Sequence, residues 1–90
     1  MTARLLAAAA VLLLTGCAGS RSAARGRAIF ERSCAGCHTL TGRDTDAPGG
    51  DLRAARLSAG AVASFARVMP VHPPLTAADA RAVGRYVASR

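Results

Sequence analysis

The stretch Cys34-Ala35-Gly36-Cys37-His38 decides how the rest of this chain is interpreted. Cys-x-x-Cys-His is the pattern by which proteins attach a c-type haem. Two residues between the thiols let the two sulfurs reach the two vinyl groups on one edge of the porphyrin. The histidine that follows then lies beneath the iron and supplies an axial imidazole. The motif therefore predicts one covalently bound haem c, held by Cys34, Cys37 and His38.

Two other kinds of site use the same residue types. A redox-active dithiol of the thioredoxin kind is expected in a βαβ setting within a longer chain, and no such pattern is present. A closed zinc site needs four ligands, and the chain offers two cysteines of the motif, His38 and at best His72. The sequence therefore favours haem attachment over both alternatives.

Length and composition are those of a small domain that needs a cofactor. The 90 residues allow one domain, and a hydrophobic content of 51% excludes a disordered chain. A core of this size stabilises a fold only weakly, and the chain has no Trp, one Tyr and two Phe. The formal net charge is +7, carried by arginines without lysine. This charge predicts a partner or surface that carries negative charge. With the haem motif, we expect redox partner proteins with acidic docking patches; a nucleic-acid partner is not expected.

The first residues are typical of an export signal. Arg4 precedes an unbroken apolar run over 5–14, which is too short to span a membrane. Leu14-Thr15-Gly16-Cys17 then resembles the lipobox of bacterial lipoproteins, in which the peptide is cut before the cysteine and the sulfur takes a diacylglycerol. The alternative is an ordinary signal peptide with an unrelated cysteine near its end.

These features divide the chain into a lipoprotein signal peptide (1–16), a flexible tether (17–22) and a folded domain (23–90). Lipidation of Cys17 also accounts for the odd cysteine among three, since haem uses the other two. We therefore expect an exported lipoprotein, anchored to a membrane through Cys17 and facing the periplasm or the outer cell surface.

Helical signals surround the haem motif. Apolar side chains at helical spacing predict a helix over 23–33. Ser58 can cap a second helix that runs towards 68, and Thr76 with Asp79 forms a capping box for a last helix to about 89. Residues 39–51 are rich in Gly, Asp and Thr, which predicts a loop. Because no alternating strand pattern is present, the expected fold class is all-α.

Three further stretches carry a family resemblance. Gly26-Arg27-Ala28-Ile29-Phe30 precedes the motif, Val68-Met69-Pro70 follows it, and Tyr86-Val87 lies in the last predicted helix. With them, the chain from 26 to 90 resembles the class I, monohaem c-type cytochromes. The resemblance implies a small cytochrome c-like fold of three to four helices wrapped around one covalent haem. It also implies that the N- and C-terminal helices cross, with Gly26 meeting Tyr86 and Phe30 packing beside the haem.

Met69 is the second axial ligand that the resemblance implies, opposite His38. It precedes Pro70 as the ligand does in that family, and it is the only methionine left after removal of the signal peptide. A thioether opposite histidine raises the reduction potential and fills the sixth position on the iron. His72 is the rival ligand, and we expect it to be exposed.

Secondary contacts to the haem are less specific. A metal-bound histidine normally donates its other ring N–H to a carbonyl. In the resembling family a loop proline provides that carbonyl, which makes Pro48 the match, although no glycine precedes it here. Arg53, Arg56 and Arg67 are candidate donors to the haem propionates.

Together these features predict an electron-transfer protein and not an enzyme. It would carry one electron on its haem c in an exported respiratory or redox chain. The alternative is a haem enzyme or gas sensor, in which Met69 does not bind and the iron keeps an open position. A thiol or zinc module without haem is the third hypothesis.

Overall fold

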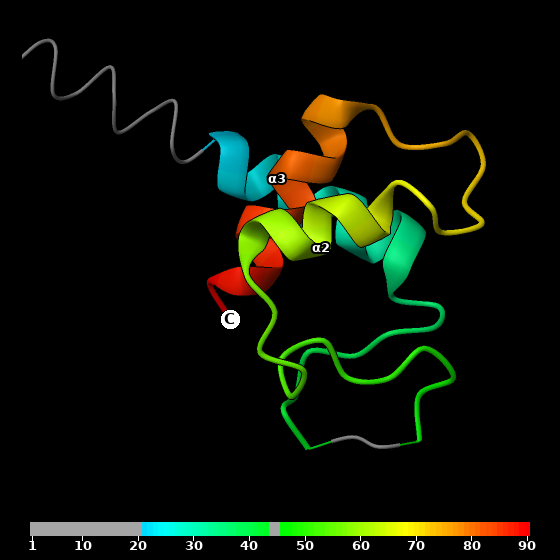
Figure 1. Cartoon of the computed structure of the whole chain (residues 1–90), viewed down its shortest axis with the longest axis vertical. Helices are drawn as coiled ribbons and strands as arrows, with labels where there is room; N and C mark the ends of the chain where they lie inside the picture. The colour runs from blue at the N-terminus through cyan, green and yellow to red at the C-terminus, as the bar shows by residue number, and fades with distance from the viewer. Residues whose placement is uncertain (1–20, 44–45) are drawn as a thin grey trace, which may run out of the picture.

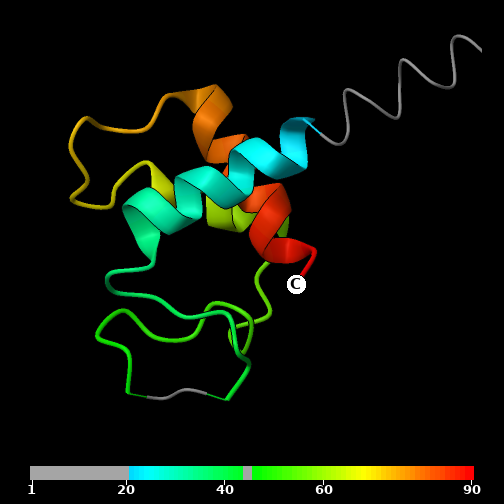
Figure 2. The ribbon, with the colours of Figure 1, turned by 180° about the vertical axis from the view of Figure 1, so that it is seen from behind.

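The computed structural model of the chain describes residues 21–43 and 46–90. The predicted signal peptide, the lipidation site Cys17 and most of the predicted tether lie outside these residues. The described part is helical over 21–29, and this helix continues into one π-helical turn, η1 (Phe30–Cys34). Two further helices follow, α2 (Ala59–Ala66) and α3 (Ala77–Ala88). The helices lie together, and two long loops extend from them (Figures 1 and 2).

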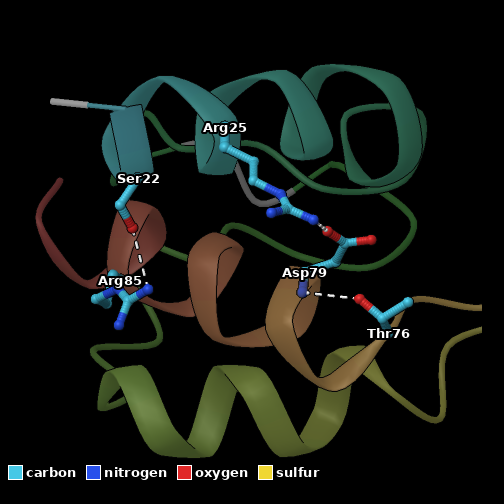
Figure 3. A network of polar contacts seen from close by, with 5 residues as sticks. All are labelled: Ser22, Arg25, Thr76, Asp79 and Arg85. Atoms are coloured by element: carbon cyan, nitrogen blue, oxygen red, sulfur yellow. Dashed lines mark hydrogen bonds and ion pairs between the residues drawn. The ribbon is translucent and has the colours of Figure 1, made fainter. Parts of the chain in front are cut away.

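The first helix is longer at both ends than the predicted range of 23–33. Arg21 and Ser22, assigned to the tether, are helical. The Ser22 hydroxyl accepts a hydrogen bond from Arg85 of α3 at 3.0 Å, and this contact helps to hold the first turn against the domain (Figure 3). At the other end the backbone N–H of Ala35 donates to Phe30 O at 2.9 Å, which closes the wider π turn. Cys34, the first cysteine of the motif, is therefore the last residue of this helix.

Side-chain caps set the starts of α2 and α3, as predicted. Ser58 Oγ accepts from the backbone N–H of Ala61 at 3.1 Å. Thr76 Oγ1 accepts from the backbone N–H of Asp79 at 3.1 Å (Figure 3). Each cap satisfies one of the backbone donors that a helix start leaves unpaired. The predicted ends differ by a residue or two, since α2 ends at 66 and not near 68.

The first helix and α3 are in direct contact, which confirms that the two terminal helices meet. A Cβ added to Gly26 would clash with Ala82 O and would lie 2.7 Å from Tyr86 Cβ. Glycine thus lets the two backbones approach, as expected for this pair. The rings of Phe30 and Tyr86 also lie against each other across this contact, with their centroids 6.0 Å apart. Arg25 of the first helix forms an ion pair with Asp79 of α3 (Figure 3).

The apolar core lies where the three helices meet. On the other side of α3, Gly84 fits against α2, since a Cβ there would clash with Ala59 O and lie 3.2 Å from Ala63 N. The apolar side chains that the fold buries, among the described residues, come from all three helices and from the end of the second loop; they are Ile29, Phe30, Val62, Ala66, Leu75, Ala80, Ala82, Val83 and Val87. Most are small, in keeping with the low aromatic content.

The connections between the helices are irregular. The longer one, between Cys34 and α2, contains a single parallel bridge between Thr39 and Asp51. The shorter one joins α2 to α3 and carries Met69. With no strand elsewhere in the described residues, the predicted all-α class is confirmed. Within that same part of the chain, none of the helices has the length and apolarity that crossing a membrane requires.

Candidate haem site

An apolar cavity lies between the end of η1, the two loops and the facing sides of α2 and α3. Its walls are mainly aliphatic side chains, to which two thiols, one imidazole and one thioether are added. The described residues that line it are Ser33, Cys34, Cys37, His38, Leu52, Leu57, Val62, Phe65, Ala66, Met69, Pro70, Val71, Leu75, Val83 and Val87. None of these side chains is an acid or an arginine.

Cys34, Cys37, His38 and Met69, the four predicted haem-binding residues, all line this one cavity. Cys34 and Cys37 are free thiols, the first partly buried and the second exposed. The backbone N–H groups of Cys37 and His38 both donate to Cys34 O, at 3.1 and 3.0 Å, so the motif forms a tight turn at the end of η1. Burial raises the pKa of the Cys34 thiol.

The carbonyl that faces the His38 ring belongs to Gly50. His38 Nδ1 lies 3.2 Å from Gly50 O. Pro48, predicted to supply this carbonyl, is exposed and is not among the lining residues. Gly50 adopts a φ of 84°, a conformation closed to proline, whose ring fixes φ near −65°. A glycine therefore stands at the position that the prediction gave to a proline.

Gly49 allows the loop to lie directly on the histidine. A Cβ at this position would come within 2.8 Å of both Cys37 O and His38 Nδ1. The backbone N–H of Gly49 donates to Cys37 O at 2.6 Å. The part of the loop around Gly49 is thus held against the Cys-x-x-Cys-His turn by a backbone hydrogen bond.

Met69 and His72 differ in their relation to the cavity. Met69 lines it, although 40% of the residue's surface is exposed, and its carbonyl accepts from Val71 N at 2.8 Å. His72 is exposed, as expected, and is not among the lining residues. Phe30 is buried against Tyr86 but does not line the cavity.

Asp51 is a polar centre that the sequence analysis missed. Its Oδ2 accepts hydrogen bonds from Thr39 Oγ1, from Thr41 N and Oγ1 and from Gly42 N, at 2.8–2.9 Å. Its Oδ1 accepts from Ala54 N at 2.9 Å. Burial acts to raise the pKa of this carboxyl, but the hydrogen bonds outweigh it and hold the pKa far below its usual range. The two hydroxyl side chains of Thr39-Leu40-Thr41 were the sequence feature that could have indicated a buried acceptor nearby.

The comparison with known families gives one match. Residues 21–87 match the family described as cytochrome c oxidase, cbb3-type, subunit III. The chain belongs to this family. It is therefore a cytochrome c domain, a class of protein that carries electrons on a covalently bound haem c and typically is not an enzyme. No curated protein and no solved structure gave a match.

The residues of the cavity fit the haem c that this family implies. An aliphatic wall suits the porphyrin faces, and the thiols, imidazole and thioether are the donor groups that c-type cytochromes use. In this cytochrome c domain Cys34 and Cys37 would hold the group covalently, and His38 and Met69 would hold its iron. The iron would supply one-electron redox chemistry, while the apolar side chains exclude water from it.

Proposed function

We propose that this chain is a one-electron carrier with a single haem c bound at Cys34 and Cys37 and ligated by His38 and Met69. The observation that carries the proposal is the convergence of these four side chains on one apolar cavity, Cys34 from the end of η1 and the other three from two separate loops. Each thiol would add across one vinyl group, forming an S–C bond while its hydrogen passes to the neighbouring carbon, so no oxidant is needed.

A carrier is favoured over a catalyst by what surrounds the iron position. Met69 is available to fill the sixth position, and thioether ligation raises the potential of a cytochrome. Besides His38, the described lining offers no side chain suited to acid–base chemistry at an open iron. The 40% exposure of Met69 is a feature that favours the alternative, a haem enzyme or gas sensor with a displaced methionine.

The proposed site of action is outside the cytoplasm, in an exported respiratory or redox chain. Support comes from the N-terminal sequence, whose pattern predicts a signal peptide over 1–16, lipidation of Cys17 and a short tether before the domain. The helix from residue 21 shortens the tether to 17–20. The lipid at Cys17 would hold the domain at a membrane that faces the periplasm or the outer surface.

The proposed partners are redox proteins with acidic docking patches. Arg43, Arg53, Arg56 and Arg90 come together around a polar hollow, which no acidic side chain among the described residues lines. Leu52 and Leu57, which flank Arg53 and Arg56 in the chain, line the haem cavity. The arginine hollow and the haem cavity are therefore lined by neighbouring residues of one chain segment, 52–57, so an acidic partner at the hollow would be close to the haem.

Haem attachment and iron access test the proposal directly. The exported protein should show the pyridine haemochrome spectrum of haem c after denaturation, and its mass should rise by one haem. A Cys34→Ala/Cys37→Ala double variant, the matched control, should show neither. The reduced wild type should not bind carbon monoxide at neutral pH. Carbon monoxide binding would replace the carrier by the enzyme or sensor, and a haem-free wild type would contradict both.

A further inference from the structure

Among the described residues, Asp51 is the charged side chain that the fold buries, with 8% of its surface exposed. A carboxylate at this level of burial must be compensated by hydrogen bonds. From the described residues Asp51 receives five, all from the loop in which it lies and none from a cation. The carboxylate therefore organises this loop.

The donors to Asp51 come from both sides of the loop. Thr39, Thr41 and Gly42 belong to the segment that leaves the Cys-x-x-Cys-His turn, and they bond to Oδ2. Ala54 belongs to the segment that leads towards α2, and it bonds to Oδ1. One side chain thus clamps the two segments at a fixed separation.

The clamp lies beside the backbone that faces the axial histidine. Leu52 N donates to Thr39 O at 2.9 Å, and Thr39 N donates to Gly50 O at 3.4 Å. Gly50, the residue immediately before Asp51, places that same carbonyl oxygen 3.2 Å from His38 Nδ1. Because Gly50 has no side chain to fix it, its carbonyl direction depends on the residues around it.

We propose that Asp51 is a positioning residue for the axial histidine: its carboxylate holds the Gly50 carbonyl against His38 Nδ1. The inference rests on the proposed function, in which His38 binds the iron through its other nitrogen. An N–H···O=C bond at the free ring nitrogen fixes the ring orientation and makes the imidazole a stronger donor. A stronger donor favours ferric over ferrous iron, so loss of the clamp raises the reduction potential.

The test compares three holoprotein variants: Asp51→Ala, Asp51→Asn and Asp79→Ala. Asp79 is a matched control, since its carboxylate too accepts a hydrogen bond, from Arg25, but does so at the contact between the first helix and α3 (Figure 3). We measure hydrogen exchange of the His38 Nδ1 proton by NMR in the reduced state, and the reduction potential. In Asp51→Ala, exchange should be at least tenfold faster and the potential higher. Asp51→Asn keeps one oxygen acceptor and should show smaller changes of both kinds.

Asp79→Ala should lose stability without either change. If Asp51→Ala does not accumulate, Asp51→Asn carries the comparison. Exchange and potential in the Asp51 variants equal to those of Asp79→Ala would overturn the inference and leave Asp51 as a stabiliser of the loop. The haemochrome spectrum distinguishes failure of this inference from failure of the proposed function. If haem is bound but the exchange rate of the His38 Nδ1 proton does not change in the Asp51 variants, the clamp alone is rejected. If the wild type binds no haem, the proposed function is rejected and the clamp with it.

Discussion

At the scale of single residues, Gly50 and Gly60 allow the effect of backbone conformation on stability to be measured apart from the effect of packing. A Cβ at either position would meet no atom within 4 Å, but Gly50 has a φ of 84° and Gly60 lies in α2. Gly50→Ala should destabilise the holoprotein by about 1–2 kcal/mol, the usual cost of a left-handed L-residue. Gly60→Ala should stabilise it by up to about 1 kcal/mol, since alanine favours a helix. Urea unfolding measures both, and equal effects of the two substitutions would disprove the role of φ.

The candidate ligands were predictable from sequence, whereas the residues behind them were not. Cys34, Cys37 and His38 form a local motif whose spacing is itself the signal, and Met69 precedes a proline in a chain with few methionines. The Gly50 carbonyl and the Asp51 clamp depend on which segments pair across the loop, which local spacing does not specify. The prediction therefore chose Pro48, two residues too early, because it followed a family pattern that this loop does not repeat.

At the scale of the helices, the ion pair between Arg25 and Asp79 joins the first helix to α3 (Figure 3). The hydrogen bond from Arg25 lowers the pKa of Asp79 below its ordinary value of 3.8, against the opposing effect of burial. The folded-state pKa is the lower one, so the pair stabilises the fold fully above the ordinary value and this stabilisation is lost as the pH falls through the folded value. Arg25→Gln should therefore lower the urea midpoint at pH 6, and this loss should shrink as the pH falls through the folded-state pKa of Asp79.

Arg27→Gln is the control for this pH dependence. Arg27 pairs with Glu31 one turn further along the same helix, and both side chains are more than half exposed, at 64% and 61%. Exposed pairs of this kind contribute little to stability. If Arg27→Gln lowered the urea midpoint as much as Arg25→Gln, the ion pair between the helices would contribute no more to stability than an exposed pair within one helix.

The helices themselves were largely predictable, because their signals are local. Ser58 and Thr76 cap α2 and α3 as their sequence context indicated. The first helix was predicted too short at its start, since the added residue Ser22 is held by a hydrogen bond from Arg85 of α3, which is distant in sequence. The π turn at its end has no local signature in Phe30–Cys34 either.

At the scale of the whole molecule, the uneven placement of arginine predicts where an acidic redox partner docks. Arg53→Gln/Arg56→Gln removes two charges from the hollow, and Arg32→Gln/Arg81→Gln removes two charges from exposed positions elsewhere. Electrostatic steering depends on charge near the contact and is screened by salt. The first pair should slow electron transfer to the partner several-fold at low ionic strength and flatten its salt dependence.

The second pair should have a clearly smaller effect at the same net charge. Stopped-flow measurements at low and physiological ionic strength give the comparison. Equal slowing by both pairs would mean that net charge, and not the arginine hollow, guides association.

The central claim is that His38 and Met69 together fill both axial positions on the haem iron. The ferric absorption spectrum of Met69→Ala tests this claim most directly. Met69 lines the cavity and His72 does not, so loss of Met69 should abolish the weak near-infrared band of sulfur-ligated ferric haem and permit carbon monoxide binding to the reduced protein. His72→Ala should keep the band and exclude carbon monoxide. A silent Met69→Ala together with a spectral change in His72→Ala would contradict the account and replace it by coordination through two histidines.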